Sequence, residues 1–306
     1  MRVIPPVTLN YSNVTSTAGS GNDPATTWSG GATYNLGDKV KVVGTVNRIY
    51  QYLGSNGTNS TTSPEIDITK LVPKWVDLGS TNVYGMFDTS RDTTTIADYT
   101  LVVVMTPGVS VDSIALLNMK GITNIRIQNT GTGTAYDKSF NVNDRFTASW
   151  YQYFFGFFRT KKAMATFDLP SNGTIFTVTF IGGVGMTIGA CILGTAINIG
   201  SIQKGATINV DNFSSINRDV FGNAQLVARR NVPKTSQTLY VDKSKLDTLI
   251  ALKYQLDATP AVWCGFDDDY LNNYFNALLI LGFYRSFTFN LSNPAGPSIS
   301  LELEEL

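Results

Sequence analysis

The sequence predicts a mainly β protein, and three features support that prediction. Residues that favour strands (Thr, Val, Ile and the aromatics) and residues that favour turns (Asn, Asp and Gly) are abundant throughout the 306 residues. Glutamate, which favours helices, occurs four times, three of them within the last five residues. Short apolar or alternating runs recur about every 8–12 residues between glycine-rich turns. We therefore expect a small aromatic β module, then a jelly-roll-like sandwich, then a small α+β unit.

Composition narrows the classes of function. Only 15% of the residues are charged, against about 25% in ordinary soluble proteins, and the formal net charge is zero. The chain has no excess of positive charge that would attract nucleic acid. The chain has no histidine, which removes the commonest general base and the commonest metal ligand. We expect no cofactor, no metal, no nucleic-acid partner and no enzyme activity.

The two cysteines, Cys191 and Cys264, lie in separate apolar runs. Two isolated thiols are too few for a zinc site. We expect both to be free and buried, because free cysteine is among the most buried residue types. A disulfide between them stays open at this point.

No export or membrane-spanning segment is predicted. The first ten residues lack the long apolar core of a signal peptide. The apolar runs 101–105 and 277–281 are too short to span a bilayer, so we expect no membrane insertion.

Residues 1–27 are predicted to form an extended arm or linker. They pass through Pro5 and Pro6 into a stretch rich in Ser, Thr, Asn and Gly. Such an arm either packs on a neighbouring subunit or is a disordered tail, and both alternatives remain open.

Residues 28–80 are predicted to form the small β module. A turn at 36–38 precedes the alternating run 39–42, and residues 49–53 alternate again. The run 75–79 closes the unit. A domain of only about 50 residues needs large aromatic side chains to build its core.

The order of residues in this stretch resembles the small chitin-binding modules attached to bacterial chitinases. The positions that match are Trp28, Tyr34, Gly37, Asp38, Val40, Tyr50, Pro64, Trp75 and Gly79. The resemblance implies exposed aromatic rings that stack on sugars. The candidate carbohydrate-binding residues are Trp28, Tyr34, Tyr50, Tyr52 and Trp75. At a position where that family often has a further exposed aromatic, this chain has Leu53. The two tryptophans are also needed for the module's own core.

The segment that follows, 79–88, carries a second resemblance. Its sequence G-S-T-N-V-Y-G-M-F-D is similar to the joint between such a module and a galactose-binding-like β-sandwich in bacteriophage virion proteins. We expect Met86 and Phe87 to anchor the joint, and Asn82 and Asp88 to make turn hydrogen bonds.

Residues 84–240 are predicted to form the sandwich. The expected strands lie at 99–105, 111–119, 122–128, 175–181 and 186–193. The aromatic segment 150–158, W-Y-Q-Y-F-F-G-F-F, would make a large patch if exposed, so it is either core or an interface.

Residues 241–306 change in character. Leucines at helical spacing predict a helix over 244–255, capped by Asp242 or Ser244. Strands are expected at 261–264, 277–290 and 298–303. One helix and three strands make the small α+β unit.

Two sets of carboxylates are candidates for chemistry. Asp267, Asp268 and Asp269 suit calcium only if further oxygen ligands join them, and a solvated loop is favoured. Glu65, in a polar loop, is the one internal glutamate, and no carboxylate pair of a glycosidase is marked by the sequence.

Two other patterns have ordinary explanations. Gly182 and Gly183 lack the G-K-[ST] ending of a phosphate loop and are expected to end a strand. Arg229 and Arg230 are expected to pair with nearby aspartates rather than to bind phosphate.

Three hypotheses follow. The first is a structural protein of a phage virion, part of its tail, assembled in the host cytoplasm as a symmetric oligomer with other tail proteins. The second is a dedicated receptor-recognition protein that holds host-surface glycan during attachment. The third, and least favoured, is an enzyme acting on polysaccharide.

Overall fold

The structure is a computed structural model, and it describes residues 1–44, 47–90, 93–144, 149–156, 159–203, 205–218, 220–265, 278–291 and 296–306. The contacts divide the chain into two compact units. The module-bearing unit comprises Val7–Ala163 and Asp168–Ile192, and the terminal unit comprises Met1–Pro6, Met164–Phe167 and Leu193–Leu306. The terminal unit is not one consecutive segment, because its first strand, at residues 2–4, pairs with strands that lie after residue 196.

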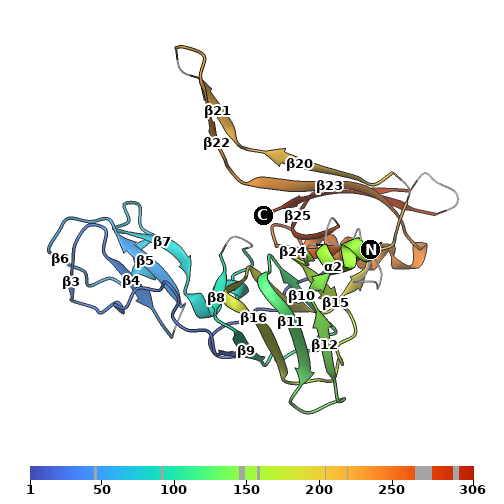
Figure 1. The fold of residues 1–306 in the computed structure, drawn as a ribbon, viewed down its shortest axis with the longest axis horizontal. Helices are drawn as coiled ribbons and strands as arrows, with labels where there is room; N and C mark the ends of the chain where they lie inside the picture. Colours follow the sequence, from blue (N-terminus) through green and yellow to red (C-terminus); the bar gives the residue numbers. More distant parts are fainter. Residues whose placement is uncertain are drawn as a thin grey trace. The chain divides into compact units, whose positions relative to one another are not determined.

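The prediction of a mainly β fold is confirmed, and the terminal unit is built on one antiparallel sheet of eight strands (Figure 1). In order, they are β18 (Ile197–Asn198), β1 (Arg2–Ile4), β24 (Ala261–Cys264), β25 (Leu279–Asn290), β26 (Ser298–Glu305), β23 (Asn231–Tyr240) and β19 (Ser201–Ile202), with β20 (Thr207–Asn212) also paired to β23. The contacts also assign β15 (Met164–Thr166) to this unit. The strands expected at 261–264 and 298–303 are confirmed, as is the described part of the strand expected at 277–290.

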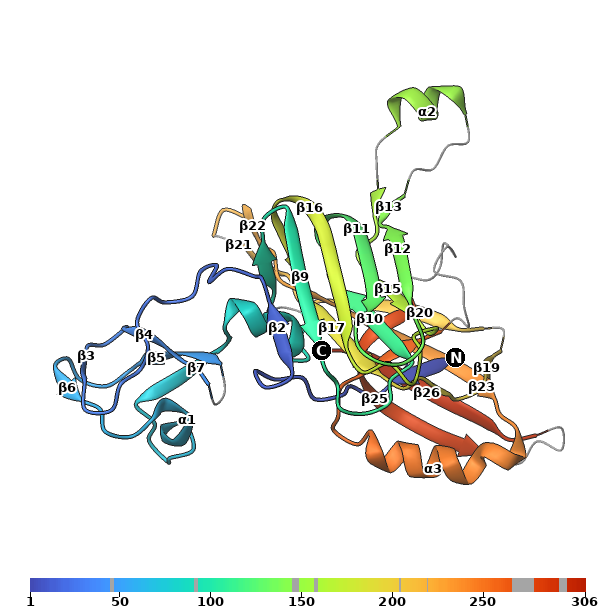
Figure 2. The same cartoon turned by 90° about the horizontal axis from the view of Figure 1, so that it is seen from below.

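Among the described residues of this unit, one longer helix packs on the sheet, and Figure 2 shows it below β25 and β26. It is α3 (Leu246–Gln255), and it follows the 3₁₀ turn η2 (Lys243–Lys245). Leu249 and Leu252 share a buried core with Trp263 of β24 and with side chains of β26. The Asp242 carboxylate accepts a hydrogen bond from the backbone N–H of Ser244 at 3.0 Å. The helix expected over 244–255 is found as α3 from Leu246 onward, and Asp242 caps the preceding turn η2 rather than α3 itself.

The first residues of the chain form a strand inside this sheet. β1 pairs with β18 on one side and with β24 on the other, and the side chains of Val3 and Ile4 are fully buried. A further strand of the expected arm, β2 (Val14–Ser16), pairs with β9 (Thr100–Met105) in the module-bearing unit. The expectation of an extended arm over 1–27 missed both pairings, because their partners lie far along the chain.

The larger part of the module-bearing unit is sandwich-like. One sheet contains, in order, β12 (Asp137–Asn141), β11 (Lys120–Asn129), β16 (Phe176–Ile188), β9 and β2, with β8 (Thr95–Ala97) also paired to β16. Its strands bury alternate residues, which is typical of a sheet with one covered face. β10 (Ser113–Leu117) and β17 (Ala190–Gly194) are neighbours in a second sheet and are buried throughout.

The two cysteines are free and buried, as predicted. The Cys191 sulfur on β17 lies 4.0 Å from the Met105 sulfur on β9, which shows that the two sheets face each other. Burial raises the pKa of Cys191 to about 12, so the thiol stays protonated at neutral pH.

Two short hairpins complete the described elements. In the module-bearing unit, β13 (Asn143–Asp144) pairs with β14 (Arg159–Thr160), and the segment between them carries the helix α2 (Trp150–Phe155) (Figure 2). In the terminal unit, β21 (Ser215–Arg218) pairs with β22 (Ala224–Val227). No helix within the described ranges is both long and apolar enough to cross a membrane.

Candidate functional site

The aromatic module is a small antiparallel sheet with two additions. Its strands are β4 (Lys39–Val42), β5 (Arg48–Tyr52) and β7 (Trp75–Ser80), with β5 in the middle. β3 (Thr33–Tyr34) pairs with β6 (Thr58–Asn59), and the one-turn helix α1 (Pro64–Asp67) lies between β6 and β7 in the chain. The alternating runs in the sequence therefore correspond to the strands of this sheet.

Four of the five candidate carbohydrate-binding residues form the core of the module. Tyr34, Tyr50, Tyr52 and Trp75 are at most 4% exposed. The ring centroids of Tyr34 and Tyr52 lie 5.0 Å and 4.9 Å from that of Trp75, with their planes steeply inclined to it. Aromatic pairs prefer such edge-to-face contacts, and they explain how about 50 residues build a core.

This placement leaves those four rings no open face on which a sugar could stack. Trp28 is only partly buried and packs against the same core. Leu53, at the position that departs from the resembled family, is 51% exposed. The rings that suggested a sugar-binding face thus act in this fold as packing residues, and Trp28 alone of the five retains appreciable surface.

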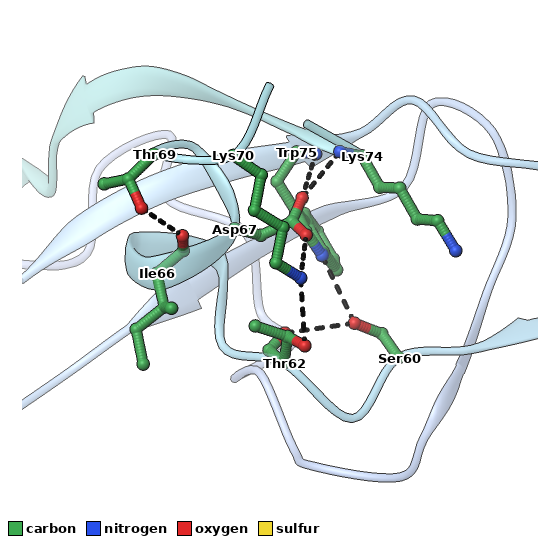
Figure 3. Close-up of polar contacts among 8 residues, drawn as sticks. All are labelled: Ser60, Thr62, Ile66, Asp67, Thr69, Lys70, Lys74 and Trp75. Carbon is green, nitrogen blue, oxygen red and sulfur yellow. Dashed lines mark hydrogen bonds and ion pairs between the residues drawn. The ribbon is translucent and has the colours of Figure 1, made fainter. Parts of the chain in front are cut away.

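A buried carboxylate holds the module together on the α1 side (Figure 3). Asp67, the last residue of α1, is 3% exposed. It accepts hydrogen bonds from the backbone N–H groups of Lys74 at 2.6 Å and Trp75 at 3.1 Å, and from the Lys70 ammonium at 2.9 Å. The same ammonium donates to the Thr62 hydroxyl at 3.2 Å. Asp67 therefore ties α1 to the start of β7.

Opposing effects act on the pKa of Asp67. Burial, the largest single effect, raises it, but the hydrogen bonds from Lys70, Lys74 and Trp75 together outweigh burial and hold the pKa below its ordinary value. The group is charged at neutral pH and its acceptor oxygens are occupied. This describes a structural carboxylate rather than a general acid. No pattern in the sequence marks Asp67 for this role.

The joint after the module is organised by Asn82, at the start of the 3₁₀ helix η1 (Asn82–Phe87). Its amide group donates to the carbonyls of Gly19 at 2.8 Å and Ile96 at 2.9 Å, and its oxygen accepts from the Ile96 N–H at 2.8 Å. Met86 is fully buried, and Phe87 is partly buried. Asp88 accepts from the Ser90 N–H at 2.9 Å. The burial of Met86 and the turn hydrogen bond of Asp88 are confirmed. The expected turn hydrogen bonds of Asn82 are not found: its side chain instead joins segments that are distant in the sequence.

The other polar candidates do not form a site in the described part of the chain. Glu65 lies in α1 rather than in a loop. Asp267, Asp268 and Asp269 fall outside the described residues. Within those residues, no group of three or more His, Cys, Asp or Glu side chains is placed to hold a metal ion.

The expectation that Gly182 ends a strand is wrong, because both glycines lie within β16. A Cβ atom on Gly182 would come 2.3 Å from the Gly121 carbonyl oxygen, so close backbone approach requires glycine there. Asp211 forms an ion pair with Lys234 at 2.6 Å. The pairing of Arg229 and Arg230 with nearby aspartates stays a prediction.

Two exposed apolar surfaces were not assigned by the sequence argument. The first is α2, the described part of the aromatic segment 150–158, and it is not core. The exposed fractions of its aromatic side chains are 77% for Trp150, 73% for Tyr151, 50% for Tyr153, 65% for Phe154 and 69% for Phe155.

The second exposed surface is a segment of the terminal unit that we call the ribbon, residues 207–230, of which 219 lies outside the described part. It comprises β20, β21, β22 and their connections, and Figure 1 shows it continuing beyond the end of β20 as the β21–β22 hairpin. Its exposed apolar side chains are Ile208, Val210, Phe213, Ile216, Val220, Phe221 and Leu226.

Comparison with known proteins adds no assignment: no protein family, no curated protein and no solved structure matches the chain.

Proposed function

We propose that this chain is a non-enzymatic structural component of a bacteriophage virion, part of the tail, and that its copies assemble with each other into a symmetric oligomer. The assignment to a virion rests on the resemblance of the module and of the joint at 79–88 to virion proteins. The assembly of copies rests on the ribbon.

The β21–β22 hairpin has one apolar face and one polar face. Ile216 and Leu226 lie directly opposite each other, so their side chains point to the same face, and they are 60% and 68% exposed. The next pair along, Asn217 and Gln225, points to the other face. A sheet with this alternation normally packs its apolar face against another element.

Among the described strands, β21 and β22 pair only with each other. An isolated two-stranded hairpin is marginally stable in water and needs further packing. At the tip, Val220 and Phe221 are 94% and 86% exposed. A second copy of the chain is the favoured cover, because a chain with only 15% charged residues has a surface suited to burial between subunits.

The oligomer can be tested by light scattering on the purified full chain. We expect a defined oligomer for the unaltered protein and a shift toward monomer for the double variant Ile216→Ser with Leu226→Ser. The matched control is Asn217→Ser with Gln225→Ser on the opposite face, which should leave the mass unchanged. A chain that is monomeric at all concentrations would contradict the assembly.

The place in a virion needs a separate measurement. Mass spectrometry of purified particles should detect the chain in stoichiometric amounts, and imaging of those particles should locate it in the tail. Its absence from particles would overturn the virion assignment while leaving the assembly of copies intact.

Contact with host-surface glycan is a second candidate, and Trp28 is the observation that favours it. This ring matches the resembled modules and retains solvent-exposed surface beside the core. Binding on a glycan array should be lost in Trp28→Ala if this role holds. Trp75→Ala is a poor test, because removing the central core ring would unfold the module. Glycan binding that survives Trp28→Ala in a folded module would assign it to other residues.

A further inference from the structure

The helix α2 carries aromatic side chains on all of its sides. Five of its six residues are Trp, Tyr or Phe, and each of those five is at least half exposed. Successive residues are rotated by about 100°, so these side chains surround the helix rather than forming one stripe. A helix that docks on a flat protein surface needs only one apolar stripe, whereas a helix that is apolar all round is surrounded by apolar material.

We propose that α2 is a membrane-contacting tip that inserts its aromatic rings into the interfacial layer of a bilayer containing anionic lipid. Trp and Tyr are the residues enriched at the membrane–water interface, where an apolar ring body and a polar edge are both accommodated. A helix of six residues is about 9 Å long. It is far shorter than the roughly 30 Å of a bilayer's hydrocarbon core, so it reaches the interfacial layer and does not span the membrane.

The charges around α2 fit an anionic surface. The sequence has no charged residue from 146 to 158. This uncharged segment is flanked on its two sides by Arg145, Arg159, Lys161 and Lys162, against the single acidic neighbour Asp144. Basic residues beside an apolar tip are attracted to anionic headgroups by about 1 kcal/mol each near the surface.

Backbone polar groups at both ends of α2 are hydrogen-bonded, which favours burial in an apolar layer. The Ser149 hydroxyl accepts a hydrogen bond from the Gln152 N–H at 3.2 Å, and the Ser149 carbonyl accepts from the Tyr153 N–H at 2.9 Å. The Gly156 N–H donates to the Gln152 carbonyl at 2.8 Å. These bonds satisfy groups at both ends of the helix that would otherwise oppose leaving water.

Insertion of α2 differs from the membrane-spanning insertion that the lengths of the apolar runs in the sequence exclude. That expectation concerned runs long enough to span a bilayer, and the tip reaches only its interfacial layer. The inference is independent of the proposed assembly, since α2 and the ribbon share no residue.

Vesicle binding of the full chain tests the tip. The probes are vesicles of phosphatidylcholine alone and vesicles in which part of it is replaced by phosphatidylglycerol. We expect sedimentation with the anionic vesicles and a blue shift of tryptophan emission. Sedimentation should fall about tenfold or more in Trp150→Ser with Phe154→Ser, because two rings no longer leave water. The blue shift is read only in the unaltered protein, since Trp150 is the tryptophan that reports it. Tyr254→Ser, an exposed tyrosine on α3, is the matched control and should bind as the unaltered protein does.

A variant that lacks one basic side chain separates the electrostatic contribution to vesicle binding from the contribution of the aromatic rings. Lys162→Gln should weaken binding to the anionic vesicles and leave any binding to neutral vesicles unchanged. The proposal is overturned if the unaltered protein binds neither kind of vesicle, or if the tip variant binds as well as the unaltered protein. A tip variant that instead lowers the oligomeric mass, without vesicle binding by the unaltered protein, would identify α2 as an interface between copies.

Discussion

At the scale of single residues, Asp67 shows how one buried charge fixes a small fold. Its carboxylate receives two backbone N–H groups from the start of β7 and the ammonium of Lys70. These contacts hold Trp75 at the position where its ring meets Tyr34 and Tyr52. The aromatic core of the module therefore depends on a polar residue beside it.

Replacing Asp67 by Ala should destabilise the module strongly. The change leaves the backbone N–H groups of Lys74 and Trp75 without their acceptor, and each orphaned group costs about 1–3 kcal/mol, whereas the half-exposed Lys70 ammonium keeps the Thr62 hydroxyl. We expect a loss of about 3 kcal/mol or more in the free energy of unfolding, measured by denaturant titration with tryptophan fluorescence. Thr61→Ala, an exposed change in the adjoining segment, is the control and should have little effect. Equal stability of the two variants would refute the role given to Asp67.

The same residue should make the module sensitive to acid. The pKa of Asp67 in the folded chain lies below its ordinary value of 3.8. The charged form is therefore favoured by folding, and its contribution is fully present above pH 3.8 and lost as the pH falls through the folded pKa. We expect the stability difference between the unaltered protein and Asp67→Asn to be constant near neutral pH and to shrink below about pH 4. A difference that persists undiminished at pH 2 would contradict this.

At the scale of elements, α3 illustrates a helix held by tertiary packing. Its ten residues are too few for a stable isolated helix. Leu249 and Leu252 are at most 3% exposed and face the sheet, whereas Tyr254 is 76% exposed. The helix therefore depends on its buried leucines.

Shortening one of these leucines should show that dependence. We expect Leu252→Ala to lower the free energy of unfolding of the terminal unit by about 2–5 kcal/mol, because it removes buried methyl groups and leaves a cavity. Tyr254→Ser, two residues away on the exposed side, should change it by less than about 0.5 kcal/mol. Chemical denaturation monitored by circular dichroism measures the free energy of unfolding of both variants. Similar losses in the two variants would contradict the dependence of α3 on its buried leucines.

At the scale of the whole molecule, the two units are not consecutive stretches of the chain. β1 is a strand of the terminal unit, yet it precedes the whole module-bearing unit in the sequence. The amino group of Met1 donates to the Gly200 carbonyl at 2.5 Å, which joins residues 199 positions apart. The terminal unit therefore needs both ends of the chain.

Deleting residues 1–6 should consequently weaken the terminal unit selectively. The deletion removes the fully buried side chains of Val3 and Ile4, which contribute about 1.5–3 kcal/mol each. We expect faster hydrogen exchange at the amides of β24, measured by mass spectrometry, with the amides of β5 in the module as the internal control. Unchanged protection of β24 would mean that β1 is dispensable.

Much of the fold class and many of the elements were predictable, because their signals are local. Alternation at 39–42, the apolar run 261–264 and the leucine spacing of 244–255 each specify an element within a few residues. The residues of the candidate site were less predictable. A buried core tyrosine and an exposed ligand-stacking tyrosine have the same sequence signal, and Asp67 has no local signature, since its partners are set by the turn that follows it.

The sequence by itself determined that this protein is mainly β, that its cysteines are buried thiols, and that the module at 28–80 is built on aromatic residues. Only the tertiary structure decided that Tyr34, Tyr50, Tyr52 and Trp75 face inward, that Arg2–Ile4 is a strand in a sheet, and that α2 is exposed. The physical reason is that propensity and periodicity act between neighbours in the chain. Burial and strand pairing depend instead on segments that are up to about 260 residues apart, as Arg2 and Cys264 are.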